Sequence, residues 1–251
     1  MLTKQRKQAI LDALKRDGQV VAKTLSESFG VSEDTVRRDL RELASEGLLQ
    51  RVHGGALLAS PAEADFTHRQ SIATKEKCAV ALRAARMVSA GQVVIIDGGT
   101  TAVQMAQALP RTLAATVVTH SPSVAVALMD HAEIEVILIG GRLYKHSMVA
   151  VGAAALEALA HIRADTYFMG VTGVHTSAGL STGDLEEAYM KRALASHAAE
   201  TVVLASSEKL NAASRFKIGD LTLASTLVVD RMTDPVLTDG IEAQGVTIVR
   251  A

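Results

Sequence analysis

Cysteine, proline and aromatic residues are scarce in this chain. Its 251 residues include one cysteine, four prolines, four phenylalanines, three tyrosines and no tryptophan. A single cysteine, Cys78, excludes an intrachain disulfide and is typical of a reducing cytosol. Because aromatic side chains are few, we expect a core of Ala, Val, Ile and Leu.

A large net charge is also missing. The formal net charge is −1, with 21% charged and 48% hydrophobic residues, which argues against both disorder and a globally basic nucleic-acid coat. The charge is uneven, because residues 1–58 carry ten Lys/Arg against eight Asp/Glu and the remainder carries sixteen against nineteen. The N-terminal part is therefore slightly basic and the rest slightly acidic.

Several sequence signals are absent as well. The first sixteen residues mix charges at helical spacing, unlike a signal peptide, and no apolar run approaches the ~18 residues of a membrane span. Cys78 has no partner cysteine, the eight histidines lack ligand spacing, and no nucleotide-binding glycine motif occurs. We therefore expect a cytoplasmic protein with no membrane contact, no metal and no cofactor.

The N-terminal part predicts three short helices. Apolar residues recur every fourth position, first at Ile10 and Leu14 and then at Val21, Leu25 and Phe29, and glycines at positions 18 and 30 end the two runs. Only three residues separate the second run from a third helix. A helix, a short glycine turn and a second helix are typical of a helix-turn-helix.

The third helix separates its residues into two faces. Ser32 is placed to cap its N-terminus, and Val36, Leu40 and Leu43 form an apolar stripe. The opposite face and its flanks carry Asp34, Thr35, Arg37, Arg38, Arg41 and Ser45. In a recognition helix, the first two turns are where side chains reach bases or phosphates in a major groove.

A basic hairpin is predicted to follow. Gly47 ends the helix, and the alternating residues 48–53 before Gly54 and Gly55 indicate a β-hairpin wing that carries Arg51 and His53 to a neighbouring phosphate or minor groove. A charged outer face by itself often only keeps a helix soluble. Here the arginines occur together with the glycine turn, the serine cap and the wing, so DNA binding is the stronger interpretation.

These residues resemble the N-terminal signature of the DeoR family of bacterial transcriptional regulators. The matching positions are Val31, Ser32, Thr35, Val36, Arg37, Arg38, Asp39, Leu40, Leu43, Gly47, Arg51, His53, Gly54, Gly55 and Ala56. The resemblance implies a winged helix that binds operator DNA, usually as a repressor, with Thr35, Arg37 and Arg38 at contact positions. The whole predicted DNA-facing set is Ser32, Asp34, Thr35, Arg37, Arg38, Arg41, Arg51 and His53.

The rest of the chain predicts a second, larger domain. We expect a winged-helix domain at 1–58, a Pro-containing linker at 59–73 and an α/β domain at 74–251. Short apolar runs at 93–96, 116–119, 135–139, 166–169, 202–205, 227–229 and 246–249 alternate with Ala-rich helical segments. Uniformly apolar runs suit strands buried on both faces, so the expected fold is an open, mostly parallel α/β sheet.

Ligands in such sheets bind beyond the carboxyl ends of the strands, where this chain has several polar residues. The candidates are Asp97, Gly98, Gly99, Thr100, Thr101, His120, Gly141, Arg142 and Lys209. The Gly-Gly-Thr-Thr run before a helix predicts a phosphate cradle, although such a turn is often only structural. Arg142 is expected to clamp an anion. For His120 and Lys209, a structural hydrogen bond and plain solvent exposure remain alternatives.

A further polar group lies near residue 184. Asp184 precedes Glu187 and Lys191, which are four apart, so an ordinary helix-surface pair explains the last two about as well as a role in a site.

The C-terminal part resembles the effector domain of the DeoR family, whose fold is similar to sugar-phosphate isomerases and coenzyme A transferases. The resemblance implies that a phosphorylated sugar or related metabolite binds there and weakens operator binding. Two positions depart from the family pattern, with His120 in place of the usual Asn and Ser206 in place of the usual Asp.

Two other functions remain alternatives. The scaffold would suit a sugar-phosphate isomerase with Asp97, Asp184 or Glu187 as base, but an isomerase has no use for the N-terminal module. An architectural DNA binder would need no ligand pocket. A single winged helix covers little DNA, so we also expect a homo-oligomer, either a dimer or a tetramer.

Overall fold

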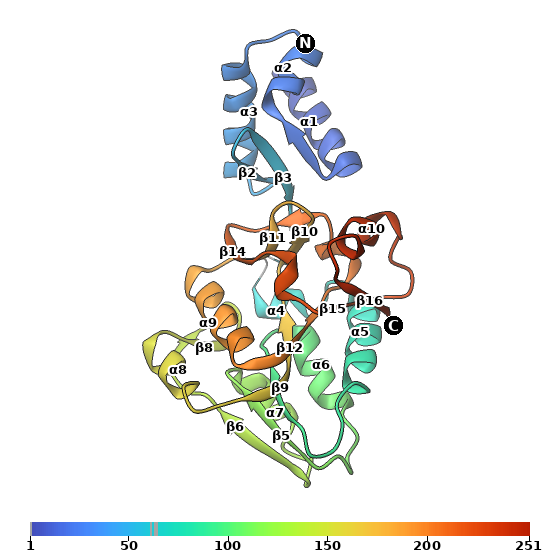
Figure 1. Cartoon of the computed structure of the whole chain (residues 1–251). Coiled ribbons are helices and arrows are strands. Elements are labelled where there is room, and N and C mark those ends of the chain that lie inside the picture. The colour runs from blue at the N-terminus through green and yellow to red at the C-terminus, as the bar shows by residue number, and fades with distance from the viewer. Residues whose placement is uncertain (1, 61, 63–64) are drawn as a thin grey trace.

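The chain forms a small N-terminal head joined by a narrow neck to a larger body (Figure 1). The computed structural model describes residues 2–60, 62 and 65–251. In these ranges no helix is long and apolar enough to cross a membrane.

The head is a winged helix. Its elements are α1 (Thr3–Asp17), β1 (Gln19–Val21), α2 (Ala22–Phe29), α3 (Glu33–Ser45), β2 (Leu49–Val52) and β3 (Gly55–Ala59). Ile10, Leu14, Val36, Leu40 and Leu43 are buried together in its core, which confirms the apolar stripes predicted from helical spacing. Each such side chain contributes roughly 1.5–3 kcal/mol when fully buried.

One prediction in the head is wrong in detail. Val21 was expected on the second helix, but it lies in β1 and its side chain is exposed. The physical reason is pairing, because Val21 lies opposite Gly55 of the wing and is therefore extended. The helix begins one residue later, at Ala22.

The body is built on a seven-stranded sheet. Its strands are β4 (Val93–Ile96), β5 (Ala115–Thr119), β6 (Ile134–Leu138), β9 (Ala164–Gly170), β12 (Ala198–Leu204), β15 (Thr226–Val229) and β16 (Thr247–Arg250). They lie in the order β16-β15-β12-β9-β4-β5-β6, and every neighbouring pair is parallel. The seven apolar runs are these seven strands, so the predicted parallel α/β sheet is confirmed.

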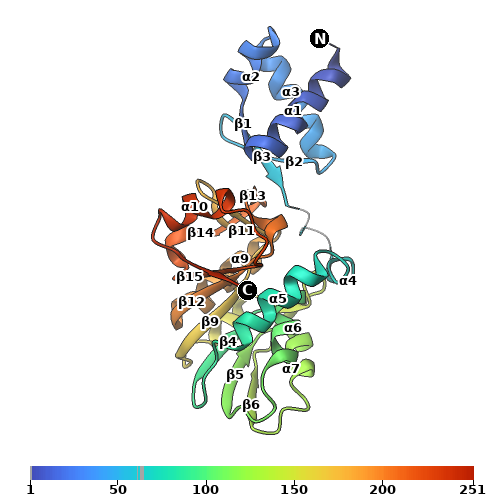
Figure 2. The ribbon, with the colours of Figure 1, turned by 90° about the vertical axis from the view of Figure 1, so that its right-hand side faces the viewer.

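Helices and small hairpins cover the sheet. The helices are α4 (Phe66–Arg69), α5 (Thr74–Ala85), α6 (Thr100–Ala108), α7 (Pro122–Ala127), α8 (Ala153–Ala158), α9 (Leu185–Ser196) and α10 (Val236–Glu242). The remaining elements are β7 (Arg142–Tyr144), β8 (Val149–Val151), β10 (Gly173–His175), β11 (Gly179–Thr182), η2 (Ser207–Lys209), β13 (Ala212–Ala213), β14 (Phe216–Gly219) and η3 (Leu221–Leu223). Figure 2 shows α5, α6 and α7 together on one face of the sheet.

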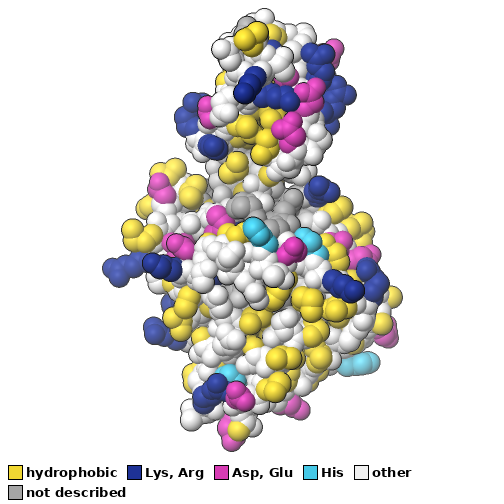
Figure 3. Space-filling model, turned by 180° about the vertical axis from the view of Figure 1, so that it is seen from behind, with side chains coloured by type: hydrophobic (Ala, Val, Ile, Leu, Met, Phe, Trp, Pro, Cys, Tyr) yellow, Lys and Arg dark blue, Asp and Glu magenta, His cyan; other side chains and the backbone are white. Residues whose placement is uncertain are grey.

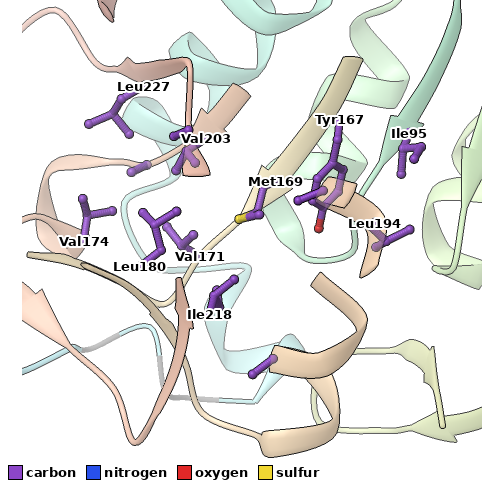
Figure 4. Packing of buried hydrophobic residues seen from close by; sticks show 14 of the residues in the cluster. Ile95, Tyr167, Met169, Val171, Val174, Leu180, Leu194, Val203, Ile218 and Leu227 are labelled. Atoms are coloured by element: carbon purple, nitrogen blue, oxygen red, sulfur yellow. The ribbon is translucent and has the colours of Figure 1, made fainter. Parts of the chain in front are cut away.

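Both faces of the sheet are buried, because successive side chains of a strand point to opposite sides. Val94 and Phe168 pack in the cluster with α5, α6 and α7. Ile95, Tyr167 and Met169 pack in the other cluster, with α8 and α9 (Figure 4). Two-sided burial explains why the strands are apolar throughout.

Helix α5 buries one of its faces. Its buried stripe runs through Val80, Ala81 and Ala84, whereas Leu82 is 44% exposed.

Strand β3 belongs to both parts of the molecule. It pairs antiparallel with β1 and β2 in the head, and its last two residues, Leu58 and Ala59, pair in parallel with β13 of the body. The segment 59–73, predicted as a linker, thus begins inside a strand and contains the helix α4. The division at 1–58, 59–73 and 74–251 stays a prediction.

Candidate DNA interface and anion cavity

The recognition helix α3 begins as its sequence predicts. The hydroxyl of Ser32 accepts a hydrogen bond from the backbone N–H of Thr35 at 3.3 Å. The two side-chain hydroxyls also lie 3.0 Å apart. Such a cap is worth about 1 kcal/mol, and it orients the first turn of the helix, where base contacts are made in winged helices.

Most cations of the predicted DNA-facing set are exposed. Among the residues that the structure describes, no ion pair involves Arg38, Arg41 or Arg51, and all three are exposed. Arg37 differs, because its guanidinium lies 2.6 Å from a carboxylate oxygen of Glu33 on the same helix. Figure 3 shows Lys and Arg side chains gathered on the surface of the head.

A groove of about 380 Å³ lies between α3 and the wing. Arg37 and Leu40 line it from α3, and Arg51 and His53 line it from the wing. The groove therefore brings Arg37 of α3 together with Arg51 and His53 of the wing. Asp34 is exposed at the helix start, where its charge suits the helix dipole.

A buried ion pair holds α3 in place. Arg6 of α1 donates to both carboxylate oxygens of Asp39, and both side chains are almost completely buried. Asp39 belongs to the matching family positions, and the structure shows its role: it ties the back of α3 to α1. Sequence reasoning missed Arg6, although it lies four residues before Ile10 and eight before Leu14 on the buried stripe of α1.

The body has a cavity at the point where the strand order reverses. From β4 the chain proceeds outward through β5 and β6 and then returns to β9 on the other side of β4. Ligands in open α/β sheets bind at such a switch point, beyond the carboxyl ends of the strands. Here the cavity is lined by residues 98–102 after β4 and 170–172 after β9.

Four cations converge on this cavity. They are Arg69, Lys77, Lys191 and Lys209, and Glu187, Ser147 and Thr182 add polar groups. The three lysines are all buried. Several cations that gather at the N-terminus of α6 create a site for an anion, because the first N–H groups of a helix have no partner within the helix.

Two buried polar atoms of the lining form no hydrogen bond with any residue that the structure describes. They are Nε of Arg69 and the hydroxyl oxygen of Thr101. An unpaired buried polar group is costly, which makes both atoms natural partners for a bound ligand. Gly99 begins the helix at φ 104°, a conformation that only glycine adopts without strain.

Asp97 lies directly behind the cavity and is fully buried. Its carboxylate accepts hydrogen bonds from Lys191 at 2.5 Å, from Tyr167 at 2.9 Å, and from the backbone of Gly98 and Gly170 at 2.7 and 2.8 Å. Burial alone would raise the pKa of Asp97, but Lys191 and His120 outweigh it and hold the pKa below its usual value. Asp97 thus organises the site instead of contacting a ligand.

Burial disfavours the charged form of the cavity cations. Desolvation and the neighbouring Lys77, Arg69 and Lys191 together lower the pKa of Lys209 to about 8, against the opposing effect of Glu208. Desolvation likewise lowers the pKa of Arg69 and of Lys77. An anion in the cavity would stabilise the charged form of all three and raise their pKa values.

His120 does not reach the cavity. Its Nε2 lies 2.8 Å from Oδ1 of Asp97, and its Nδ1 lies 2.9 Å from the carbonyl oxygen of Ala150. Both ring nitrogens are therefore engaged by protein groups. The structural alternative for His120 is the one that the geometry shows.

Arg142 and Gly141 are also outside the cavity lining, which corrects the expectation of an anion clamp there. Both residues are exposed, and Arg142 begins β7. They follow β6, which is an edge strand separated from β4 by β5. Adjacent strands are about 4.8 Å apart, so the end of β6 lies too far from the switch point.

The pair Glu187 and Lys191 is buried and not a surface pair. The hydroxyl of Thr182 donates to Glu187 at 3.1 Å, and Lys191 is 3% exposed. The sequence does contain a signal for the burial of Lys191. It lies three residues after Ala188 and three before Leu194, on the buried stripe of α9. Lys77 carries the same signal, because it lies three residues before Val80 and four before Ala81 on the buried stripe of α5. Arg69 had no such signal, because it comes from a segment expected to be a linker.

Glu208 supplies a carboxylate near Lys209. The hydroxyl of Ser206 donates to Oε1 of Glu208 at 2.7 Å. Although Ser206 replaces the Asp usual in the family, a carboxylate is thus present two positions later along the same turn.

A second pocket of about 220 Å³ adjoins the cavity. Arg69, Glu187 and Ser147 line both spaces, and Tyr144 and His146 stack at the outer one with ring centroids 5.6 Å apart. The inner cavity itself has only about 30 Å³ of space, close to the share of one water molecule. Arg69 thus stands between a tight inner site and a roomier outer one.

The described part of the chain holds no cluster of three or more His, Cys, Asp or Glu side chains arranged for a metal. The candidate bases of an isomerase have other roles. Asp97 is held by the contacts above, and Asp184 accepts from the backbone N–H of Glu187 at 3.0 Å as the cap of α9.

Two family models match the chain. Residues 6–62 match the DeoR-like helix-turn-helix domain, and residues 72–231 match the DeoR C-terminal sensor domain. Among solved structures, the chain is similar to ribose 5-phosphate isomerase A from Methanocaldococcus jannaschii, with a TM-score of 0.40 and 21% identity over 53% of this chain and 52% of that chain.

Curated relatives extend over almost the full length. The chain is 34% identical to the HTH-type transcriptional regulator GlpR of Haloferax volcanii over 99% of this chain and 98% of the relative. It is 30% identical to the glycerol-3-phosphate regulon repressor of Escherichia coli, over 90% of each chain. With its winged-helix head and its sensor domain, the chain belongs to the DeoR family of transcriptional regulators and is not an enzyme.

Proposed function

We propose that this regulator represses genes of carbohydrate metabolism, and that a phosphorylated sugar or related metabolite in the cavity changes its affinity for operator DNA. The observation that carries the proposal is the convergence of Arg69, Lys77, Lys191 and Lys209 at the N-terminus of α6. A phosphate group matches this lining, because its oxygens accept several hydrogen bonds at once.

The remaining lining suits a hydroxylated carbon chain. The carboxylate of Glu187 accepts hydrogen bonds from hydroxyls, and Ser147 and Thr182 add hydroxyl groups of their own. The printed name of the Escherichia coli relative, a glycerol-3-phosphate regulon repressor, contains a molecule of this kind. Residues 98–101 and Lys209 of the predicted effector set are therefore assigned to the phosphate.

Binding requires the cavity to open. The inner space of about 30 Å³ is smaller than any sugar phosphate, and the outer pocket adds about 220 Å³. Arg69 lines both, so its movement would join them. Once a ligand is bound, Arg69 would lie over the phosphate and close the site. Its Nε would then donate a hydrogen bond to the ligand.

The head supplies the DNA contacts. Arg38, Arg41 and Arg51 are exposed, Arg51 lines the groove between α3 and the wing, and Thr35 lies in the first turn of α3. We propose that two or four copies assemble in the cytoplasm, because paired heads bind half-sites with a high effective concentration.

The test combines a ligand screen with a DNA measurement. Thermal shift and calorimetry against glycerol 3-phosphate and pentose and hexose phosphates should show a stabilising ligand, by about 2.7 kcal/mol at 100 times its Kd. Duplexes selected from a random library then serve as the operator. The same ligand should change affinity for them by roughly 5- to 150-fold.

The matched sugar without phosphate is the control ligand. A screen with no stabilising phosphate, or a ligand that binds without any change in DNA affinity, contradicts the proposal. The variant Thr100→Ala should lose the ligand response.

A further inference from the structure

Five consecutive residues connect the cavity to the DNA-binding head. Lys209 lines the cavity, and Leu210 is buried and forms a bridge with Val174. Ala212 and Ala213 then pair with the last two residues of β3. We call residues 209–213 the coupling segment.

Asn211, in the middle of the segment, packs against the head. A Cβ added to Gly18 would lie 1.8 Å from Nδ2 of Asn211, so the side chain fills the space left by the glycine. Gly18 ends α1 at φ 71°. Asn211 itself has φ 54°, a left-handed conformation that is uncommon outside glycine, so its backbone is held by the surrounding structure.

A second connection runs beside the first. The hydroxyl of Ser60, directly after β3, donates to the carbonyl of Thr172 at 2.5 Å and accepts from the backbone N–H of Ala62 at 3.1 Å. Thr172 and Ala62 both line the cavity. The wing strand therefore continues into the cavity wall.

The pairing between the two parts is short. The register of β3 with β13 covers two residue pairs, whereas β3 pairs with β2 over four. Segments with few hydrogen bonds open at lower free energy than the elements they join. The junction is thus the part of the neck that can change while the head and the sheet stay folded, and Figure 2 shows β3 extending from the head toward the body.

We infer that Asn211 is a positioning residue that docks the head on the body, and that the coupling segment transmits a displacement of Lys209 to α1 and β3. This dock goes beyond the proposed function, and only its role in regulation rests on that function. An anion that draws Nζ of Lys209 inward also moves the turn η2. Asn211 and β13 follow directly in the chain, so the contacts with Gly18 and β3 shift with it.

The dock is tested by a pair of glycine substitutions. Gly18→Ala and Gly30→Ala both place Ala at a positive φ, at 71° and 63°, but the added Cβ at position 30 meets nothing within 4 Å. Both substitutions therefore strain the backbone, with ψ −21° at position 18 and 38° at position 30, but only Gly18→Ala collides with Asn211. We expect Gly18→Ala to speed hydrogen exchange of the amides at 57–60 and 212–214 about tenfold more than Gly30→Ala does.

Asn211→Gly completes the cycle. It removes the side chain and keeps a residue suited to positive φ, so Gly18→Ala in this background should keep only its own backbone strain and lose the part of its effect that comes from the collision. An equal effect of Gly18→Ala with and without Asn211 would overturn the dock, as would equal effects of the two glycine substitutions.

Transmission is tested without ligand or operator. Lys209→Met and Lys77→Met each remove a buried cavity cation, but only Lys209 belongs to the coupling segment. Lys209→Met should change exchange at 57–60 several-fold, Lys77→Met should not, and the Lys209 effect should disappear with Asn211→Gly. Identical effects of the two lysine variants overturn transmission. A failed ligand screen leaves this test intact, so the two proposals fail separately.

Discussion

The predicted DNA-facing cations of the head are exposed, whereas the cavity lysines of the body are buried. Arg38, Arg41 and Arg51 of the head are exposed to solvent. Lys77, Lys191 and Lys209 of the body are 2%, 3% and 7% exposed. The same kind of side chain therefore stands in two different dielectric environments.

The difference teaches how charge is matched to a partner. Exposed cations stay hydrated in the unbound protein and suit a long polyanion. Binding to such a polyanion is driven by counterion release and weakens as the salt concentration rises. Buried cations are costly unless compensated, and they suit one small anion that enters the same dry space. In the body, Asp97 and Glu187 compensate part of the charge and leave the rest for a ligand.

Removal of Asp97 should have the largest effect. Asp97→Ala leaves Lys191 buried without its partner and leaves the hydroxyl of Tyr167 unpaired, so we expect a loss of about 3–5 kcal/mol in the free energy of unfolding. Urea denaturation measures it. The control is Asp130→Ala, whose side chain is 84% exposed and should change stability little. Equal losses in the two variants would show that the network does not stabilise the body.

Loss of Lys209 should weaken ligand binding strongly. Lys209→Met removes a desolvated charge partner of the phosphate, and such truncations cost 2–5 kcal/mol, which corresponds to roughly 30-fold or more in affinity. Calorimetry with the phosphorylated ligand from the screen measures the change. Lys217→Met, at an exposed lysine of β14, is the control, and an unchanged affinity for Lys209→Met would remove Lys209 from the site.

The exposed cations should respond to salt instead. Arg38→Ala is expected to reduce DNA affinity roughly tenfold and to lower the slope of log affinity against log salt by about 1. Arg37→Ala should do less, because Arg37 is already paired with Glu33 at 2.6 Å. A salt series on both variants tests the ranking, and a larger effect of Arg37→Ala would reverse it.

The pH dependence should give the smallest change. Because the pKa of Lys209 is lowered to about 8, its charge is lost as pH rises through that value. Ligand affinity should fall by about fivefold from pH 8 to 9. The free energy of unfolding should instead rise with pH between about 8 and 10.4. In this range the folded form binds the Lys209 proton less well than the unfolded form does. Lys209→Met should abolish both trends.

The central strands of the body were predictable because most of their residues are buried on both faces of the sheet. Such burial favours apolar residues at nearly every position, whereas the edge strands β6 and β16 have exposed residues. The winged helix was predictable for a similar reason, since the stripe of Val36, Leu40 and Leu43 and the cap at Ser32 are local features. Val21 was misplaced because its strand depends on pairing with a distant residue.

The cavity was predictable only in part. Residues 98–101 and Lys209 line it as expected, since each follows a strand at the same edge of the sheet. Arg142 also follows a strand, but the spatial order places β6 at the far edge. Arg69 comes from a segment expected to be a linker, so no local pattern marked it.

By itself, the sequence determined the elements of this protein: the cap and stripe of the recognition helix, the seven buried strands, and the glycine turn after β4. These follow from periodicity and backbone conformation, which act over a few residues. Only the tertiary structure decided which strand ends meet, which lysines are buried, and that Asn211 packs against Gly18. Such contacts join residues far apart in the chain, and their free energy depends on burial that no local pattern encodes.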